Sequence, residues 1–169
     1  MKKYTLIAVV GVCLFQAAFM LNAGETGVLT VSVDKKVAMK LTLPVKWTSR
    51  VWKNKTILIP PKKYPHIQLW YVSEKKNVEG TVSDIADLIK SEVLKFKIKT
   101  NEDIKVAGSS GKHLTGTGLE ADDQDPSNAD VYIFSVNSKI FILCVHGEGD
   151  EAAKLRTAVK NILSTVKSV

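Results

Sequence analysis

Cysteine is scarce in this chain of 169 residues, which contains only two. Two cysteines are too few to staple a small disulfide-rich scaffold, so stability must come from a hydrophobic core. Histidine is almost as rare, and the three histidines do not stand at the spacing of a zinc motif. No apolar run reaches the about 20 residues of a membrane-spanning helix, and internal repeats are absent. With 45% hydrophobic and 24% charged residues, the chain is expected to form one globular domain.

Residues 1–23 have the layout of a secretory signal peptide. Two lysines precede an apolar stretch from Leu6 to Leu21, and Ala23 is the small residue before the expected cleavage point. This stretch of about 16 residues would span only about 24 Å as a helix, less than the hydrocarbon core of a bilayer. We therefore expect residues 1–23 to be removed and the chain to be periplasmic or secreted. An uncleaved N-terminal anchor is the alternative.

Beyond this leader, the pattern of apolar residues predicts a single α+β domain at residues 24–169. Two helices are expected at 83–96 and 151–166, where apolar residues recur at three- and four-residue steps. Strands are expected at 28–33, 37–43, 56–59, 67–72, 103–107, 112–119, 130–136 and 139–145. Because the strands form hairpins that two helices interrupt, they predict an antiparallel β-sheet flanked by helices.

The last two predicted strands should lie at the centre of the sheet. Residues 130–136 and 139–145 flank the turn dipeptide Asn137-Ser138 and are apolar at nearly every position. A strand that is apolar on both sides is covered on both sides, which indicates a central position. Asp150 is expected to cap the helix that follows this hairpin.

Several short sequence segments occur in an order that resembles that of a known family. A strand ends in Leu43-Pro44-Val45-Lys46-Trp47, and a strand after the mid-chain helix enters the glycine turn Val106-Ala107-Gly108-Ser109-Ser110-Gly111. A polar strand, the apolar hairpin and a closing helix complete the order. Over residues 28–169 this order is similar to that of the PsbP/Mog1-like proteins. The resemblance implies an α/β/α sandwich and an accessory or binding role, but it implies no single activity and assigns no binding residue.

Several motifs that suggest chemistry are better explained as structure. The segment Gly108-Ser109-Ser110-Gly111-Lys112 lacks the first glycine and the final Ser or Thr of a phosphate-binding loop, so a turn is expected. Cys144 lies in an apolar strand and is expected to be a buried structural cysteine. The acidic segment 120–128 lacks the central glycine of a calcium loop and is expected to be solvated. We therefore predict no metal site and no cofactor.

Charge is distributed unevenly along the chain. The formal net charge is +7, and residues 35–73 contain nine basic residues, no acidic residue and all three tryptophans. Basic groups beside aromatic rings suit the recognition of an anionic partner. The alternative is that the lysines form a solvated face and the tryptophans pack beneath the loops. The predicted binding residues are Lys46, Trp47, Arg50, Trp52, Lys53, Lys55, Lys62 and Lys63.

These observations favour an exported, non-enzymatic binding or accessory protein that recognises an anionic envelope component or an acidic protein. An exported enzyme with a polar site near His113, His146 and the acidic segment is the alternative, with His146 as the leading histidine. Nucleic acid is not expected as a partner, because the export signal takes the chain away from it. Contact with a membrane is expected only through the leader, if the leader persists.

Overall fold

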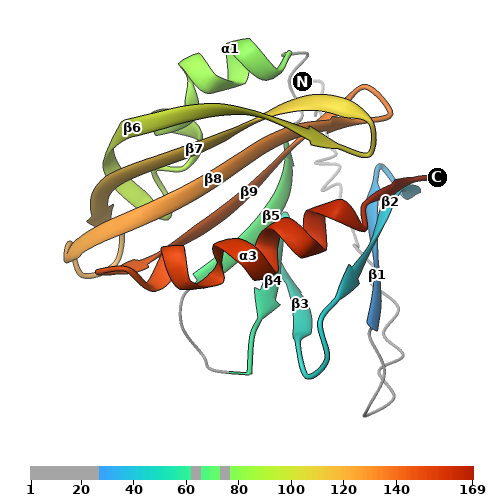
Figure 1. Ribbon diagram of the computed structural model, residues 1–169, viewed down its shortest axis with the longest axis horizontal. Helices are drawn as coiled ribbons and strands as arrows, with labels where there is room; N and C mark the ends of the chain where they lie inside the picture. Colours follow the sequence, from blue (N-terminus) through green and yellow to red (C-terminus); the bar gives the residue numbers. More distant parts are fainter. Residues whose placement is uncertain (1–26, 62–65, 73–76) are drawn as a thin grey trace, which may run out of the picture.

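The computed structural model describes residues 27–61, 66–72 and 77–169, in which the strands form two antiparallel sheets (Figure 1). The predicted leader, residues 1–23, lies outside the described residues. The smaller sheet has the strand order β1-β2-β10. Its strands are β1 (Gly27–Val33), β2 (Lys36–Leu43) and β10 (Lys167–Ser168).

The larger sheet has the strand order β3-β4-β5-β9-β8-β7-β6, with all neighbouring strands antiparallel. Its strands are β3 (Thr48–Trp52), β4 (Lys55–Ile59), β5 (His66–Val72), β6 (Val93–Val106), β7 (Ser109–Glu120), β8 (Pro126–Val136) and β9 (Lys139–Glu148). The apolar hairpin predicted at 130–145 is therefore confirmed as the inner pair β8–β9. Strand β3 and strand β6 are the two edges of this sheet.

Two tight turns set the hairpins that the sequence predicts. Asp34 and Lys35 join β1 to β2 with φ angles of 53° and 64°, and Asn137 and Ser138 join β8 to β9 with φ angles of 50° and 60°. Consecutive left-handed residues match the twist of the flanking strands, and Asp34 and Asn137 are residue types that tolerate this conformation.

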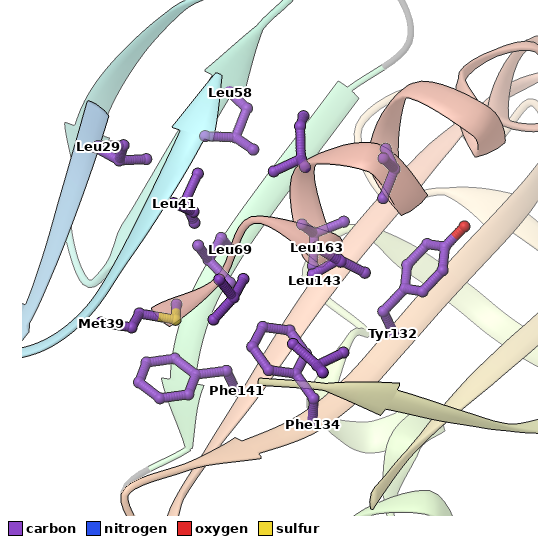
Figure 2. Close-up of a cluster of buried hydrophobic side chains, with 14 of the residues drawn as sticks. Leu29, Met39, Leu41, Leu58, Leu69, Tyr132, Phe134, Phe141, Leu143 and Leu163 are labelled. Atoms are coloured by element: carbon purple, nitrogen blue, oxygen red, sulfur yellow. The ribbon is translucent and has the colours of Figure 1, made fainter. Parts of the chain in front are cut away.

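One face of the larger sheet is covered by helix α3 (Glu151–Ser164) together with the β1–β2 hairpin. Figure 1 shows α3, in red, lying across the long strands of the sheet. Figure 2 shows Leu29 and Met39 from the hairpin facing Phe141 and Leu143 of β9. These side chains are at most 7% exposed, so they form a continuous core on this face.

The opposite face is covered by two short helices, α1 (Val78–Ser83) and α2 (Ile85–Leu88). Ile85 and Ile89 pack there against Val131, Ile142 and other buried side chains of β8 and β9. Since alternate residues of a strand point to opposite faces, each inner strand contributes to both cores. Helices thus cover both faces of the sheet, which confirms the predicted α+β class and the α/β/α sandwich.

The helix predicted at 83–96 is wrong in its extent. The helical residues lie earlier, in α1 and α2, and Asn77 rather than Ser83 caps the start by accepting a hydrogen bond from the amide of Gly80 at 2.7 Å. The chain turns after Ile89, and β6 begins at Val93. The ladder with β7 accounts for this, because β6 pairs with it from Val93 to Val106 and satisfies its backbone groups.

Three other details differ from the prediction. Strand β3 lies where the sequence predicts no strand, and the last helix ends at Ser164 rather than at residue 166. Asp150 occupies the N-cap position but makes no capping hydrogen bond, because its carboxylate pairs instead with Lys154 at 2.9 Å. Among the described helices, none is sufficiently long and apolar to cross a membrane.

Candidate functional site

The predicted basic and aromatic residues lie mainly along strand β3 and its turns. Arg50 is exposed within β3, Trp52 at its end is 52% exposed, and Lys53 follows in the turn to β4. The Lys53 ammonium lies 4.4 Å from the centre of the Trp52 ring. Lys46 is exposed in the turn before β3. Because β3 is an edge strand, these side chains follow one margin of the larger sheet.

Two of the predicted binding residues have structural roles. Trp47 is 6% exposed and packs in the core beneath the β1–β2 hairpin, so it does not offer surface contact area. Lys55 is partly buried, and its ammonium pairs with the carboxylate of Glu92 and donates to Ser91 at 2.9 Å. The charge of Lys55 is therefore already balanced within the chain. Lys62 and Lys63 lie outside the described residues.

A hollow of about 580 Å³ lies beside β3, on the face of the sheet that α1 and α2 cover only in part. Exposed side chains form its rim, among them Arg50, Trp52 and Asp122. Buried polar side chains form its floor, namely Gln68, Glu92, Glu120 and His146. The predicted basic segment, His146 and the acidic loop thus meet at one place.

Strand pairing brings the polar floor together. His146 lies near the end of β9, opposite His66 of β5, and the two rings stack with centroids 5.2 Å apart. Glu120 is the last residue of β7 and pairs with Val93, so Glu92 lies beside it. The amide of Ala121 also donates to the Glu92 carbonyl at 3.1 Å. Residues that are far apart in the sequence are therefore brought together at one end of the larger sheet.

His146 lies between two carboxylates. Its Nδ1 is 2.8 Å from Glu120 Oε2, and its Nε2 is 3.6 Å from Glu92 Oε2. Burial lowers the pKa of His146, but the two carboxylates outweigh burial and raise the pKa to about 9. His146 is therefore an imidazolium at neutral pH, with N–H groups on both ring nitrogens.

Glu92 is the most heavily paired carboxylate of the site. Lys55 donates to its Oε1, the Gln68 amide donates to its Oε2, and Ser91 lies 3.0 Å from Oε1. Burial raises the pKa of Glu92, but His146 and Lys55 outweigh burial and lower the pKa to about 2. The pKa of Glu120 is also lowered, because His146 offsets the effect of burial. Both carboxylates are ionised at neutral pH.

Three buried polar atoms on this floor have no hydrogen-bond partner among the described residues. They are Gln68 Oε1, Glu120 Oε1 and His146 Nε2. Two of them are acceptors, and the third is a donor because His146 is protonated. Leaving such atoms unpaired is costly, and their gathering beside a hollow makes this floor the candidate site.

The structure does not bring His113 and His146 together. His113 stacks on Tyr132 with ring centroids 4.3 Å apart, on the face covered by α3. Its Nε2 lies 2.7 Å from Asp130 Oδ1, and Arg156 of α3 donates to the same carboxylate at 3.1 Å. His146 follows Cys144 and Ile142 on the opposite face. The two histidines therefore belong to separate clusters.

The remaining sequence candidates behave as structural elements. Cys144 is fully buried, and burial raises the pKa of its thiol far above the usual range. Ala107 and Gly108 form a tight turn with φ angles of 50° and 79°, and β7 starts at Ser109. Within the described residues, no cluster of His, Cys, Asp and Glu is arranged to hold a metal ion.

Three residues of the floor were missed in the sequence. Gln68 lies on strand β5, on the face that also carries the buried Trp70 and Val72. A lone polar residue in such a pattern is a signal that could have identified Gln68, because burying it requires a partner, whereas Glu92 and Glu120 have no such apolar pattern around them. The sequence alone could not show that the three converge on His146.

Comparison with known proteins identifies the fold. No family model and no curated protein matches the sequence. Among solved structures, CyanoP, the PsbP protein of the cyanobacterium Synechocystis, is 10% identical with a TM-score of 0.59, covering 90% of this chain and 98% of its own. LpqN of Mycobacterium tuberculosis, which is involved in cell envelope biogenesis, is 11% identical with a TM-score of 0.54, covering 83% and 90%.

A Pseudomonas aeruginosa protein of unknown function is also similar, at 12% identity and a TM-score of 0.53, covering 82% of this chain and 94% of its own. Identities this low establish the fold and nothing more. The chain therefore has the PsbP-like fold that the order of its sequence segments predicted.

Proposed function

We propose that this protein is an exported, non-enzymatic binding protein that recognises an anionic component of the cell envelope through strand β3 and its turns. The observation that carries the proposal is the exposure of Lys46, Arg50, Trp52 and Lys53 along one sheet edge, next to the hollow. Export rests on the predicted leader. The involvement of LpqN in cell envelope biogenesis supports an envelope role for a chain of this fold.

The exposed edge suits an anionic partner for a physical reason. Among its four side chains three are basic, and the fourth is a large aromatic ring that offers contact area at a low entropic cost. Lys46 and Lys53 stand beyond opposite ends of the five-residue strand β3, which is about 17 Å long. A partner with repeated negative charges, such as a lipid surface or an acidic polysaccharide, would reach both ends.

An exported enzyme is the second candidate, because His146 does lie at a hollow with two carboxylates. Its electrostatics favour binding instead. A general acid or base works best with a pKa near the operating pH, whereas the pKa of His146 is raised to about 9 and that of Glu92 is lowered to about 2. Release of a product from any envelope component by the purified chain, abolished by His146→Gln, would favour the enzyme.

The binding proposal is tested with vesicles that contain phosphatidylglycerol and, separately, with soluble polygalacturonate. The chain is expected to bind at least one of them, and not vesicles of phosphatidylcholine alone. Binding should fall steeply as salt rises, because exposed charges are screened beyond about 8 Å at physiological ionic strength. These two probes separate a lipid headgroup from an acidic polysaccharide as the source of charge.

Charge reversal supplies the matched comparison. The double variant Lys46→Glu/Lys53→Glu is expected to weaken binding at least tenfold, or about 1.4 kcal/mol. The control Lys105→Glu/Lys160→Glu makes the same change in net charge at exposed positions of β6 and α3, and should bind like the wild type. Equal losses in both variants, or binding to neither probe, would show that the edge at β3 is not the recognition surface.

A further inference from the structure

The geometry points to a sugar-binding site: we propose that the hollow beside β3 holds a sugar ring of an envelope carbohydrate. This inference rests on the proposed function, because it names the class of ligand that the exported binding protein would meet. The hollow, of about 580 Å³, lies within the range of sites that enclose small molecules.

Charge balance on the floor disfavours a strongly charged group at that position. The cations of Lys55 and His146 stand against the anions of Glu92 and Glu120, each within contact distance of an opposite charge. The rim of the hollow carries charges of both signs, from Arg50 and Asp122. An ion entering the floor would lose its hydration without gaining a net opposite charge. A neutral polar group avoids this cost.

Hydrogen-bonding capacity specifies that polar group further. The atoms that lack a hydrogen-bond partner among the described residues are the acceptors Gln68 Oε1 and Glu120 Oε1 and the donor His146 Nε2, which lies 3.6 Å from Glu92 Oε2. A ligand that satisfies all three must both donate and accept at closely spaced points. Hydroxyl groups do both, and a sugar ring carries several of them on neighbouring carbons.

The rim adds an aromatic surface. Trp52 is 52% exposed and lines the hollow together with Val51 and Ile57. An indole offers a broad apolar face, which suits the C–H face of a sugar ring, while the ring hydroxyls point to polar groups. An exposed tryptophan above a floor of amide, carboxylate and imidazolium groups therefore matches the two-sided chemistry of a carbohydrate.

The same floor is poorly suited to cleaving the sugar. Glycoside hydrolysis by a carboxylate pair needs one protonated carboxyl with a raised pKa as the general acid. The pKa values of Glu92 and Glu120 are both lowered, by His146 above all, so both are ionised at neutral pH. The site holds a carbohydrate without breaking it.

The test is an NMR titration of the chain with a panel of soluble oligosaccharides built from hexose, N-acetylhexosamine or hexuronic acid. At least one member is expected to shift the indole N–H of Trp52 and the ring signals of His146 in a saturable way. Trp52→Ala is expected to weaken that binding about tenfold. Trp52→Phe keeps a ring and should weaken it less, and because the side chain is exposed neither variant threatens folding.

The outcomes separate the two proposals. If no member of the panel shifts Trp52 and His146, or if Trp52→Ala binds as tightly as the wild type, the sugar site is wrong. If a neutral oligosaccharide shifts both residues while the chain ignores phosphatidylglycerol and polygalacturonate, the sugar site stands and recognition of an anionic component fails. If Lys46→Glu/Lys53→Glu loses binding to acidic oligosaccharides but keeps binding to neutral ones, both proposals are supported.

Discussion

His146 lies near the end of β9 and Glu120 at the end of β7, and a 2.8 Å contact between His146 Nδ1 and Glu120 Oε2 joins them on the floor of the hollow. The strand β8 lies between these two strands, so the pair spans the inner part of the sheet. A change in the ionisation of His146 or Glu120 therefore changes both the charge of the site and the free energy of unfolding.

Stability should fall as the pH rises from neutrality. The pKa of His146 is raised from 6.5 to about 9 on folding, so its contribution is complete below pH 6.5 and is lost as the pH passes 9. We expect the free energy of unfolding to drop by up to about 3 kcal/mol across this window. Denaturant unfolding at a series of pH values measures it. His146→Gln should flatten the profile between pH 6.5 and 9, and an unchanged profile would contradict the assignment.

The opposite sign holds for Glu92. Its pKa is lowered from 4.5 to about 2, so its contribution is complete above pH 4.5 and is lost as the pH falls towards 2. Glu92→Gln should therefore make unfolding less sensitive to acid, while costing stability at neutral pH because Lys55 loses its partner. Thermal unfolding at acidic and neutral pH tests this, with the exposed Asp123→Asn as the control.

Arg156 is expected to matter because Asp130 is 2% exposed. Arg156→Ala removes two hydrogen bonds to the Asp130 carboxylate, made at 3.1 and 3.2 Å, and should cost about 2 kcal/mol of stability. The double variant Arg156→Ala/Asp130→Asn should recover part of this loss, since the buried charge is gone. Equilibrium unfolding of the two variants measures the difference, and no recovery would mean that Arg156 acts through packing alone.

Gly116 is expected to tolerate no side chain. A Cβ there would lie 2.4 Å from the Lys97 carbonyl and 2.5 Å from the Phe96 ring, because β6 approaches β7 closely at a register shift. Gly116→Ala should destabilise the protein by about 3 kcal/mol. Gly80→Ala in α1 is the comparison, because the added methyl would meet only Asn77 Oδ1, at 3.2 Å. Equal unfolding midpoints for the two variants would contradict this account of the β6–β7 pair.

The fold was predictable where local chemistry and burial agree. Residues 130–136 and 139–145 are apolar throughout and flank Asn137-Ser138, so both the hairpin and its central position followed from the sequence. The helix at 83–96 was misplaced because Val93 and Phe96 keep a helical spacing with Ile89. Val93 and Phe96 face the same core from strand β6 instead of from a helix. The pairing of β6 with β7 is a long-range effect, which a local pattern does not show.

The candidate site was predictable only in part. Arg50, Trp52 and Lys53 were named from charge and aromatic content, and the structure leaves them exposed. The same charge and aromatic content wrongly indicated surface binding for Trp47, which turns inward after Pro44, and for Lys55, whose charge is balanced by Glu92. Such pairing joins residues 37 positions apart, and no local pattern reveals it.

Strand β3 and the adjoining hollow are proposed to form one recognition face. The direct measurement is a map of NMR shift changes in the full chain on adding phosphatidylglycerol nanodiscs or polygalacturonate, whichever it binds, at low salt. We predict the largest changes at Arg50, Trp52 and Lys53, with smaller changes at His146, all reversed by added salt. Changes centred on the outer face of α3, or none at β3, would contradict the account.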